Sequence, residues 1–218
     1  MATSGAKTLE NKPTISKESR LDFFMKITND FSDQRLLGTG SFGSVYKGIL
    51  EDGGAVAVKK LRVDGPVPPE KIFANEVHNI MVLEHENVVK LVAFCRESAV
   101  KPVLIHGGYR VAPVTETVLC YEYFHKGSLD KHIFGASNTI GWNTRFDIIK
   151  GISEGIQFLH SLPRPLLHLG LKPQNILLDD NMVPKIADFV FSRIFDKQET
   201  RKTTQSQVGT VGYMARSM

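Results

Sequence analysis

Apolar and polar residues alternate in short segments through the first half of the chain, and this pattern predicts strands. Residues 45–50 lead into the turn sequence EDGG, and the valine-rich residues 55–59 follow it. Two such segments joined by acidic and glycine residues are typical of a β-hairpin. Residues 88–95 and 118–123 have the same character, so we expect two more strands there.

The connection between these last two strands is unusually long. Residues 96–117 contain two prolines and the pair Gly107-Gly108. Because proline and glycine interrupt regular structure, we interpret this segment as a solvent-exposed insertion to which the sequence assigns no role.

Helical spacing appears first after a cluster of prolines. Residues 70–83 carry apolar side chains three or four positions apart, at Phe73, Val77 and Ile80. Glu76 projects from the edge of this apolar stripe, and a carboxylate near a buried face needs a cationic partner. We predict that Lys59, on the strand before the helix, supplies it.

The second half of the chain is helical in pattern. Residues 144–162 predict a long helix that ends before Pro163 and Pro165. Its predicted apolar stripe is Phe146, Ile149, Ile152, Ile156 and Leu159. In the first half of the chain, residues 21–31 also have roughly helical spacing. A strand-rich part and a helix-rich part, linked by residues 122–128, indicate two lobes.

Composition is that of an ordinary globular protein. The chain has 218 residues, 42% of them hydrophobic, which fits one domain or two small ones and argues against a mostly disordered chain. The net charge is only +4 and the signs are interspersed, so no nucleic-acid-binding stripe stands out.

Compartment signals point to the inside of the cell. No apolar stretch approaches the roughly 20 residues that span a bilayer, and residues 1–20 lack the hydrophobic core of a secretory signal. Those polar residues predict a flexible tail. Cys95 and Cys120 each lie in an apolar run, which favours reduced core thiols in a cytoplasmic protein.

A glycine-rich motif is the first candidate for chemistry. Gly38, Gly40 and Gly43 form the pattern G-x-G-x-x-G, which two different folds use. The dinucleotide-binding version must be followed by a helix. Here the expected strands follow it, so the sequence disfavours that fold.

A second candidate site lies around a short hairpin. Residues 176–178 and 183–187 predict two antiparallel strands, and Asn175 precedes the first as Asp188 follows the second. Both side chains then lie at the open end of the hairpin. Two oxygen ligands so placed can share Mg²⁺, which needs only one or two protein ligands when phosphates complete its shell.

The order of these features resembles a protein kinase: a glycine loop, a strand lysine, a helix glutamate, a long helix and then Lys, Asn and Asp around a hairpin. The sequence motifs are similar to those of plant receptor-like and receptor-like cytoplasmic serine/threonine kinases. The similar segments are NDFSDQRLLGTGSFGSVYKG, AVAVKKL, LCYEYFHKGSLDKHI, FDIIKGISEGIQFLH, LKPQNILLDDNMVPKIADF and GTVGYMA, which together span residues 29–215.

The resemblance implies a fold and its boundaries. It implies an α+β, two-lobed kinase-like fold with an antiparallel, β-rich N-lobe that carries one helix. Residues 1–30 would be a tail and lead-in segment, and residues 31–218 the kinase-like domain. Within that domain we expect the N-lobe at 31–121, the hinge at 122–128 and an incomplete helical C-lobe at 129–218.

The resemblance also implies roles for residues that would bind ATP and Mg²⁺. The glycine loop, flanked by Leu37 and Val45, would cover the phosphates; Lys59 would hold them and Glu76 would orient it. Ala57 would lie against the adenine, with Tyr121 as gatekeeper. The remaining implied contacts are the hinge residues Glu122, Tyr123 and Phe124, the phosphate contact Lys172, and the metal ligands Asn175 and Asp188.

The sequence departs from the family pattern at positions that matter for transfer. Gly170 stands where the family has the aspartate that accepts and orients the substrate hydroxyl, and loss of a general base costs on the order of 10²–10⁴ in rate. Val190 replaces the glycine of Asp-Phe-Gly. Because valine disfavours φ > 0, the sequence supports binding of Mg²⁺ less strongly than binding of ATP. Leu169 replaces an arginine that pairs with a phosphorylated loop, which alters regulation only.

The end of the chain carries further expectations. The family's GTVGYMAPE reads here GTVGYMA followed by Arg216, Ser217 and Met218. We therefore expect a truncated larger lobe, apolar exposure on the helix at 144–162, and incomplete recovery of activity by Gly170→Asp alone. Hydroxyl groups occur where the family carries phosphorylation sites: Thr203, Thr204, Ser206 and Thr210.

Three functional hypotheses remain open from the sequence. The favoured one is a pseudokinase that binds ATP, transfers phosphate poorly or not at all, and occupies protein partners of related kinases. The alternatives are an active serine/threonine kinase and a non-functional fragment. None of them involves nucleic acid or a membrane span.

Overall fold

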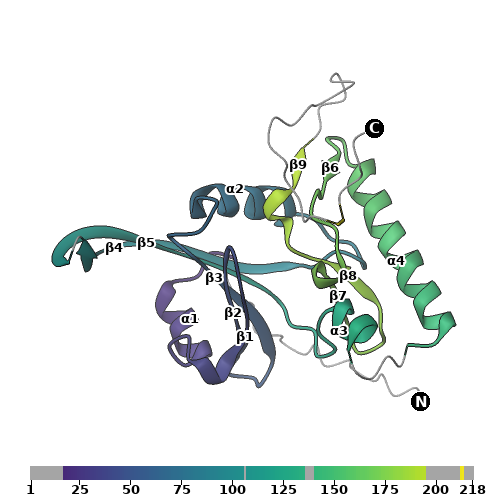
Figure 1. Cartoon of the computed structure of the whole chain (residues 1–218), viewed down its shortest axis with the longest axis horizontal. Coiled ribbons are helices and arrows are strands. Elements are labelled where there is room, and N and C mark those ends of the chain that lie inside the picture. The colour runs from purple at the N-terminus through teal and green to yellow at the C-terminus, as the bar shows by residue number, and fades with distance from the viewer. Residues whose placement is uncertain (1–16, 106, 136–139, 195–211, 214–218) are drawn as a thin grey trace, which may run out of the picture.

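The computed structural model describes residues 17–105, 107–135, 140–194 and 212–213 (Figure 1). Its first part is a five-stranded antiparallel sheet in the order β1-β2-β3-β5-β4. The strands are β1 (Leu36–Gly40), β2 (Gly43–Ile49), β3 (Ala55–Leu61), β4 (Leu91–Ile105) and β5 (Gly108–Glu122). The hairpin predicted on both sides of EDGG is confirmed as β2–β3.

One prediction about this sheet is wrong. Residues 96–117 are not an irregular insertion, because β4 and β5 continue as one antiparallel ladder until Ile105 pairs with Gly108. Gly107 has φ 79°, a conformation that glycine adopts without steric cost, and this allows a tight turn. The prolines suggested a loop, but they lie in a two-stranded ribbon with free edges, where proline is tolerated.

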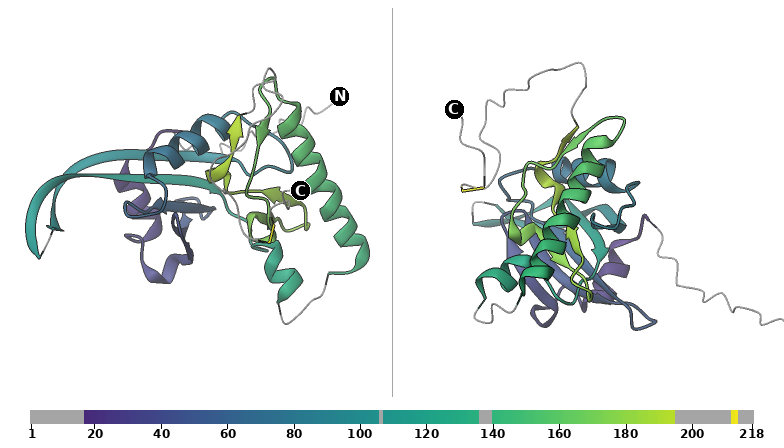
Figure 2. Two further views of the ribbon diagram at one scale, coloured as in Figure 1. Left: turned by 45° about the horizontal axis from the view of Figure 1, so that its top comes forward. Right: turned by 90° about the vertical axis from the view of Figure 1, so that its right-hand side faces the viewer.

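This ribbon, residues 96–117, is called the β-arm below. Figure 1 and the left view of Figure 2 show it as a long, twisted extension that leaves the body of the sheet on the side away from α4 (Trp142–Ser161). It remains exposed over most of its length, as the interpretation of an insertion had expected.

The two faces of the sheet bury different clusters, since neighbouring residues of a strand point to opposite faces. Val118 and Cys120 of β5 pack with Phe24 and Ile27 of α1 (Leu21–Thr28). Leu119 and Tyr121 belong to a second cluster with α2 (Pro69–Ile80). Both cysteines are free and buried in the α1 cluster, as the sequence predicted.

The described end of the predicted tail is paired with the sheet. The Ser19 N–H donates to the Phe94 carbonyl at 2.9 Å, and the Phe94 N–H donates to the Lys17 carbonyl at 2.8 Å. The prediction of a flexible tail up to residue 20 is therefore wrong for residues 17–20. Hydrophobicity could not reveal these two hydrogen bonds, because backbone groups make them.

Among the described residues after Glu122, the second part of the molecule contains two helices, one short strand pair, two 3-10 turns and the hairpin predicted from the sequence. Its elements are α3 (Leu129–Phe134), α4, β6 (Leu166–Leu167), η2 (Pro173–Asn175), β7 (Ile176–Leu178), β8 (Pro184–Ile186), η3 (Phe189–Phe191) and β9 (Arg193–Ile194). A further 3-10 turn, η1 (Asp33–Arg35), precedes β1. The predicted hairpin is confirmed as β7–β8.

The long helix α4 exists as predicted, and the expected apolar exposure on it is confirmed. Phe146 and Ile149 of the predicted stripe are more than half exposed. The face that packs against the hairpin includes Gly151 and Gly155, where an added Cβ would lie 2.7 Å from Pro184 and 2.8 Å from Ile186. Glycine permits this close approach, and a hydrophobic repeat does not mark it. In α2, Phe73 is half-buried against the core as predicted, and Ile72, which the predicted stripe did not include, is fully buried.

Candidate functional site

A cavity of about 560 Å³ lies between the sheet and the β7–β8 hairpin. Both lobes contribute to it, so residues far apart in the sequence meet around one space. The sequence-predicted residues that line it are Gly38, Gly40, Gly43, Val45, Ala57, Lys59, Glu76, Tyr121, Glu122, Asn175 and Asp188.

The glycine motif forms the turn between β1 and β2, with Gly40 paired to Gly43. At Gly43 an added Cβ would lie 2.2 Å from the Lys60 carbonyl oxygen, so only glycine fits there. At Gly38 nothing lies within 4 Å of such a Cβ. The three glycines thus present backbone without side chains at the cavity, which suits close approach to a phosphate chain.

Lys59 is the centre of an ion cluster inside the cavity. Its Nζ lies 2.7 Å from Glu76 Oε1 and 3.0 Å from Asp188 Oδ1. The Glu76 side chain is fully buried and that of Lys59 is 11% exposed. The predicted pairing of Lys59 with Glu76 is therefore observed, and Asp188 joins it from the segment after β8.

Lys59 and Asp188 keep their charges because they compensate each other, whereas burial raises the pKa of Glu76 above its ordinary value. Burial alone would lower the pKa of Lys59, but the Asp188 and Glu76 carboxylates raise it above its ordinary value. Burial favours the neutral form of Asp188, yet Lys59 holds the pKa of that carboxyl below its usual range. Near neutral pH, Lys59 is a cation and Asp188 an anion.

Tyr121 completes the coordination of Glu76. Its phenol donates a hydrogen bond to Glu76 Oε2 while Oε1 accepts from Lys59. Burial raises the pKa of Tyr121, so the phenol stays protonated and remains a donor. Both oxygens of the buried carboxylate thus have partners, which fixes the position of Lys59.

The loop before the hairpin is organised around His168. The Gly170 N–H donates to His168 Nδ1 at 3.2 Å, and His168 Nε2 lies 3.0 Å from the Ala187 carbonyl oxygen. These contacts fit the neutral ring with its proton on Nε2. Burial lowers the pKa of His168, which also favours the neutral form.

Gly170 brings no side chain to this loop. A Cβ built there would meet its nearest neighbour, Phe191, at 3.5 Å, which is ordinary contact. The backbone therefore has room for a larger residue, and the missing carboxylate is a property of the sequence rather than of crowding. The preceding residue, Leu169, has φ 56° and is exposed.

Asn175 and Asp188 lie on either side of the hairpin's open end, as its register predicted. The Ala187 N–H donates to the Asn175 carbonyl at 2.8 Å, and the Asn175 Nδ2 donates to the Gly170 carbonyl at 2.8 Å. The amide oxygen of Asn175 and the second carboxylate oxygen of Asp188 have no hydrogen-bond partner among the described residues. Such an oxygen pair fits a hard cation bound together with phosphate.

Val190 does not occupy the strained position that its place in the motif suggested. It is buried within the 3-10 turn η3, and the residue with a left-handed backbone is Asp188, at φ 67°. Asp188 still reaches Lys59 from this conformation.

Several predicted residues lie outside the lining of this cavity. Lys172 is beside it, where its charge adds to that of Lys59 in lowering the pKa of Asp188. The others are Leu37, Tyr123, Phe124 and Gly170. The predicted phosphorylation positions Thr203, Thr204, Ser206 and Thr210 lie outside the described residues.

Other lining residues were missed from the sequence. Asp130 of α3 is the most informative, because its Oδ1 is buried with no hydrogen-bond partner in the described part of the chain. The alternation of the predicted hairpin could have found Leu177, but no local signal marked the rest. The remaining lining residues are Thr39, Phe42, Val89, Gln174 and Ala187.

Comparison with known proteins places these features in a family. The family model described as "Protein kinase domain" matches residues 31–217. The G-type lectin S-receptor-like serine/threonine-protein kinase SRK of Arabidopsis thaliana is 43% identical over 192 residues, which are 86% of this chain and 20% of that protein. Receptor-like serine/threonine-protein kinase SD1-7, from the same plant, is 41% identical over 198 residues, 89% of this chain and 22% of that protein.

A third relative is named as a cysteine-rich receptor-like protein kinase. Cysteine-rich receptor-like protein kinase 37 of Arabidopsis thaliana is 41% identical over 198 residues, covering 89% of this chain and 28% of that protein. The chain thus spans less than a third of the length of these relatives. In the described part of the chain, no helix is long and apolar enough to cross a membrane.

Proposed function

This chain belongs to the protein kinase family, and on that premise we propose that it is an ATP-binding kinase domain in which phosphoryl transfer is lost or strongly impaired. The observation that carries the proposal is a contrast between the cavity and the loop beside it. The buried cluster of Lys59, Glu76 and Asp188 is complete, whereas Gly170 offers no proton acceptor.

Binding of ATP is supported by chemistry that complements a nucleotide triphosphate. The glycine turn would lie over the phosphates, and Lys59 would contact them as a cation held in place by Glu76. Ala57 would lie against the base, with the backbone of residues 122–124 as its hydrogen-bonding edge. The unpartnered carboxylate oxygen of Asp130 suits a hydroxyl donor of the ribose.

Asn175 and Asp188 would hold Mg²⁺, which supplies neutralisation of phosphate charge when it is bound. Both donors are oxygens, as Mg²⁺ prefers, and both line the cavity. Lys172 adds positive charge beside them.

Transfer of the phosphoryl group needs more than binding. The substrate hydroxyl must be oriented and lose its proton, and at residue 170 only backbone is present. Loss of a general base costs about 10²–10⁴ in rate, and loss of positioning adds to this. We therefore assign the domain a binding role, exerted on protein partners that related kinases also use.

The relatives are named as receptor-like kinases, and we place this chain, like their kinase part, on the cytoplasmic side. An active serine/threonine kinase is the second candidate, favoured by the intact ion cluster.

Thermal unfolding of residues 1–218 with and without ATP and Mg²⁺ tests the proposal. At 100 times its dissociation constant, a ligand adds about 2.7 kcal/mol of stability, so the transition should move to higher temperature. Ala57→Phe, which places an aromatic ring in the cavity, is the control that should unfold cooperatively without responding to ATP. A cooperative wild-type transition indifferent to ATP would rule out binding, and the absence of any transition would indicate a non-functional fragment.

A further inference from the structure

Two aromatic side chains meet at the end of the cavity that the glycine turn covers. Phe42 lies in that turn, between Gly40 and Gly43, and lines the cavity. Phe191 belongs to η3 and follows Asp188 by three residues. The two ring centroids are 5.2 Å apart at an interplanar angle of 81°, which is a favourable edge-to-face contact. This aromatic pair joins the sheet to the segment after the β7–β8 hairpin.

The aromatic pair also lies beside the position of the missing carboxylate. A Cβ built at Gly170 would have Phe191 Cδ2 as its nearest neighbour, at 3.5 Å. Gly170 is buried, although Leu169, the adjacent residue of the same loop, is exposed. Because Phe191 contacts Phe42 as well as this position, the two rings extend from the cavity lining to residue 170.

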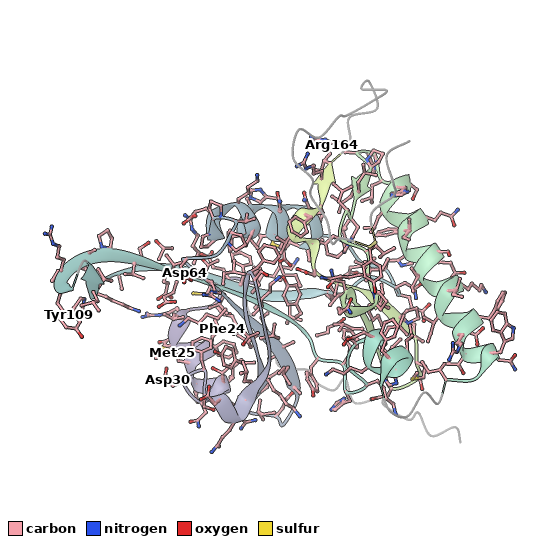
Figure 3. The ribbon with its side chains drawn as sticks, viewed as in Figure 1. Phe24, Met25, Asp30, Asp64, Tyr109 and Arg164 are labelled. Carbon is pink, nitrogen blue, oxygen red and sulfur yellow. The ribbon has the colours of Figure 1, made fainter. Side chains whose placement is uncertain are left out.

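Contacts from α2 fix the position of Phe191. The Asn75 Nδ2 donates to the Val190 carbonyl at 3.0 Å, and the Asn79 Nδ2 donates to Ser192 Oγ at 3.2 Å. These two bonds hold the residues on both sides of Phe191. The turn η3 and α2 lie side by side, and side chains fill the space between them (Figure 3). The ring of Phe191 therefore projects from an anchored backbone.

The side chain of Val190 adds to this anchoring. It is 2% exposed and belongs to the same apolar cluster as α2. A glycine at this position, as in the family pattern, would leave that space empty and give the backbone more freedom. The departure at residue 190 therefore helps to hold Phe191 in place.

Phe42 is held from the side of the sheet. Its carbonyl accepts a hydrogen bond from the Arg62 N–H at 3.0 Å, which ties the glycine turn to the end of β3. Both rings of the aromatic pair are partly buried against the large apolar cluster that includes α2. The contact between them thus depends on fixed backbone in both parts of the molecule.

We propose that the aromatic pair of Phe42 and Phe191 is a barrier that keeps protein-bound hydroxyls away from residue 170 and the phosphate end of the cavity. The inference rests on the proposed function, since it takes this cavity as the nucleotide site. A hydroxyl that accepts phosphate must approach the end of the phosphate chain beside residue 170. The two rings occupy that approach, and a water molecule needs far less space there than a serine carried by a polypeptide. The barrier and the missing carboxylate are two separate obstacles to transfer.

Thiol labelling of the full chain tests the barrier without nucleotide. Burial raises the pKa of Cys95 and of Cys120 to about 12, so these native thiols react slowly. The variant Gly170→Cys is treated with a polymer-linked maleimide and, separately, with the small reagent methyl methanethiosulfonate. Adding Phe42→Ala should accelerate the maleimide reaction by at least about tenfold and the small reagent much less, because a shielded thiol reacts only when its cover opens. Equal maleimide rates with and without Phe42→Ala would overturn the proposal.

Two matched controls accompany the labelling. Leu169→Cys lies in the same loop but is exposed, so it should react with both reagents at rates that Phe42→Ala leaves unchanged. Phe73→Ala removes a ring from another edge-to-face pair, with Phe94 at 5.5 Å, which lies outside the cavity lining. It should leave the labelling of Gly170→Cys slow. Equal acceleration by both phenylalanine variants would mean general loosening and would contradict a role for the aromatic pair.

The fate of the γ-phosphoryl group gives a second readout in the Gly170→Asp background. The group can pass to water, giving ADP and inorganic phosphate, or to a serine of casein, giving ADP and phosphoserine; in both cases the attacking hydroxyl releases a proton. Adding Phe42→Ala should raise the ratio of casein phosphorylation to hydrolysis by about tenfold or more, since only the larger acceptor is held back. An unchanged ratio would contradict the barrier. Labelling without nucleotide keeps this result distinct from a failure of the proposed function, which the thermal shift with ATP reports.

Discussion

The two sides of the cavity differ in what they retain. On the sheet side, Lys59 and Glu76 form a buried ion pair, and Tyr121 donates a hydrogen bond to the second oxygen of the Glu76 carboxylate. On the other side, in the loop before the β7–β8 hairpin, His168 holds the backbone in place by two hydrogen bonds, yet the residue it positions is Gly170. Binding chemistry and transfer chemistry are thus separable: one needs the cluster, the other a carboxylate that the loop lacks.

Replacing Lys59 by Ala should give the largest change on the sheet side. Glu76 would remain fully buried without its cationic partner, and breaking a buried ion pair costs about 3–5 kcal/mol. We expect this loss in the free energy of unfolding, measured with denaturant. Lys26→Ala, which removes an exposed ion pair with Glu51, is the control and should leave stability nearly unchanged. Equal effects of both would show that the buried cluster contributes little.

Gly170→Asp should give the largest change on the loop side. The Cβ has room, so the variant should fold, and the new carboxylate should raise ATP turnover by about 10²-fold, the lower end of general-base contributions. Gly170→Asn has a similar size and no basic oxygen, so it should leave turnover unchanged. If the two variants behaved alike, proton acceptance at residue 170 would not be what separates the two sides.

Tyr121→Phe should weaken the cluster without dismantling it. The change removes the donor to Glu76 Oε2 in a buried site, and hydrogen bonds to charged groups contribute about 1.5–3 kcal/mol. We expect a loss of about 2 kcal/mol in the free energy of unfolding with the Lys59 contact retained. Stability equal to that of the wild type would mean that the phenol is dispensable for fixing the carboxylate.

The smallest effect concerns pH and His168. Burial depresses the pKa of His168 below its ordinary value of 6.5, so the unfolded chain binds this proton more readily than the folded one. Stability from this group is therefore fully present above pH 6.5 and is lost as the pH falls through the folded pKa. Protonation of Nδ1 would also displace the Gly170 N–H.

Denaturant unfolding between pH 7.5 and 5 measures this effect, with His168→Asn as the variant that removes the titrating ring. The wild type should lose more stability than the variant on acidification. Parallel pH profiles would show that His168 does not titrate with unfolding.

Much of this arrangement could be predicted from the sequence where local chemistry decides it. The pairing of Lys59 with Glu76 followed from a carboxylate on a buried helix edge, and the meeting of Asn175 with Asp188 followed from hairpin register. Contacts between residues far apart in the sequence could not be predicted. Asp130 lines the cavity because α3 packs beside η2, and no residue spacing in the sequence predicts this contact.

The prediction for the β-arm was wrong for another reason. Proline and glycine correctly marked residues 96–117 as unsuited to the interior of a sheet. The same residues are compatible with a ribbon that has two free edges and one tight turn at Gly107. Local propensity therefore identified exposure but not regularity.

Transfer of labelled γ-phosphate from ATP, at an ATP concentration that saturates the thermal shift, tests the separation of binding from transfer most directly. We predict no incorporation into the chain or a generic protein substrate above that of the Lys59→Ala variant. Incorporation by the wild-type chain that Lys59→Ala abolishes would contradict this account and show that the domain transfers phosphate without a carboxylate at residue 170.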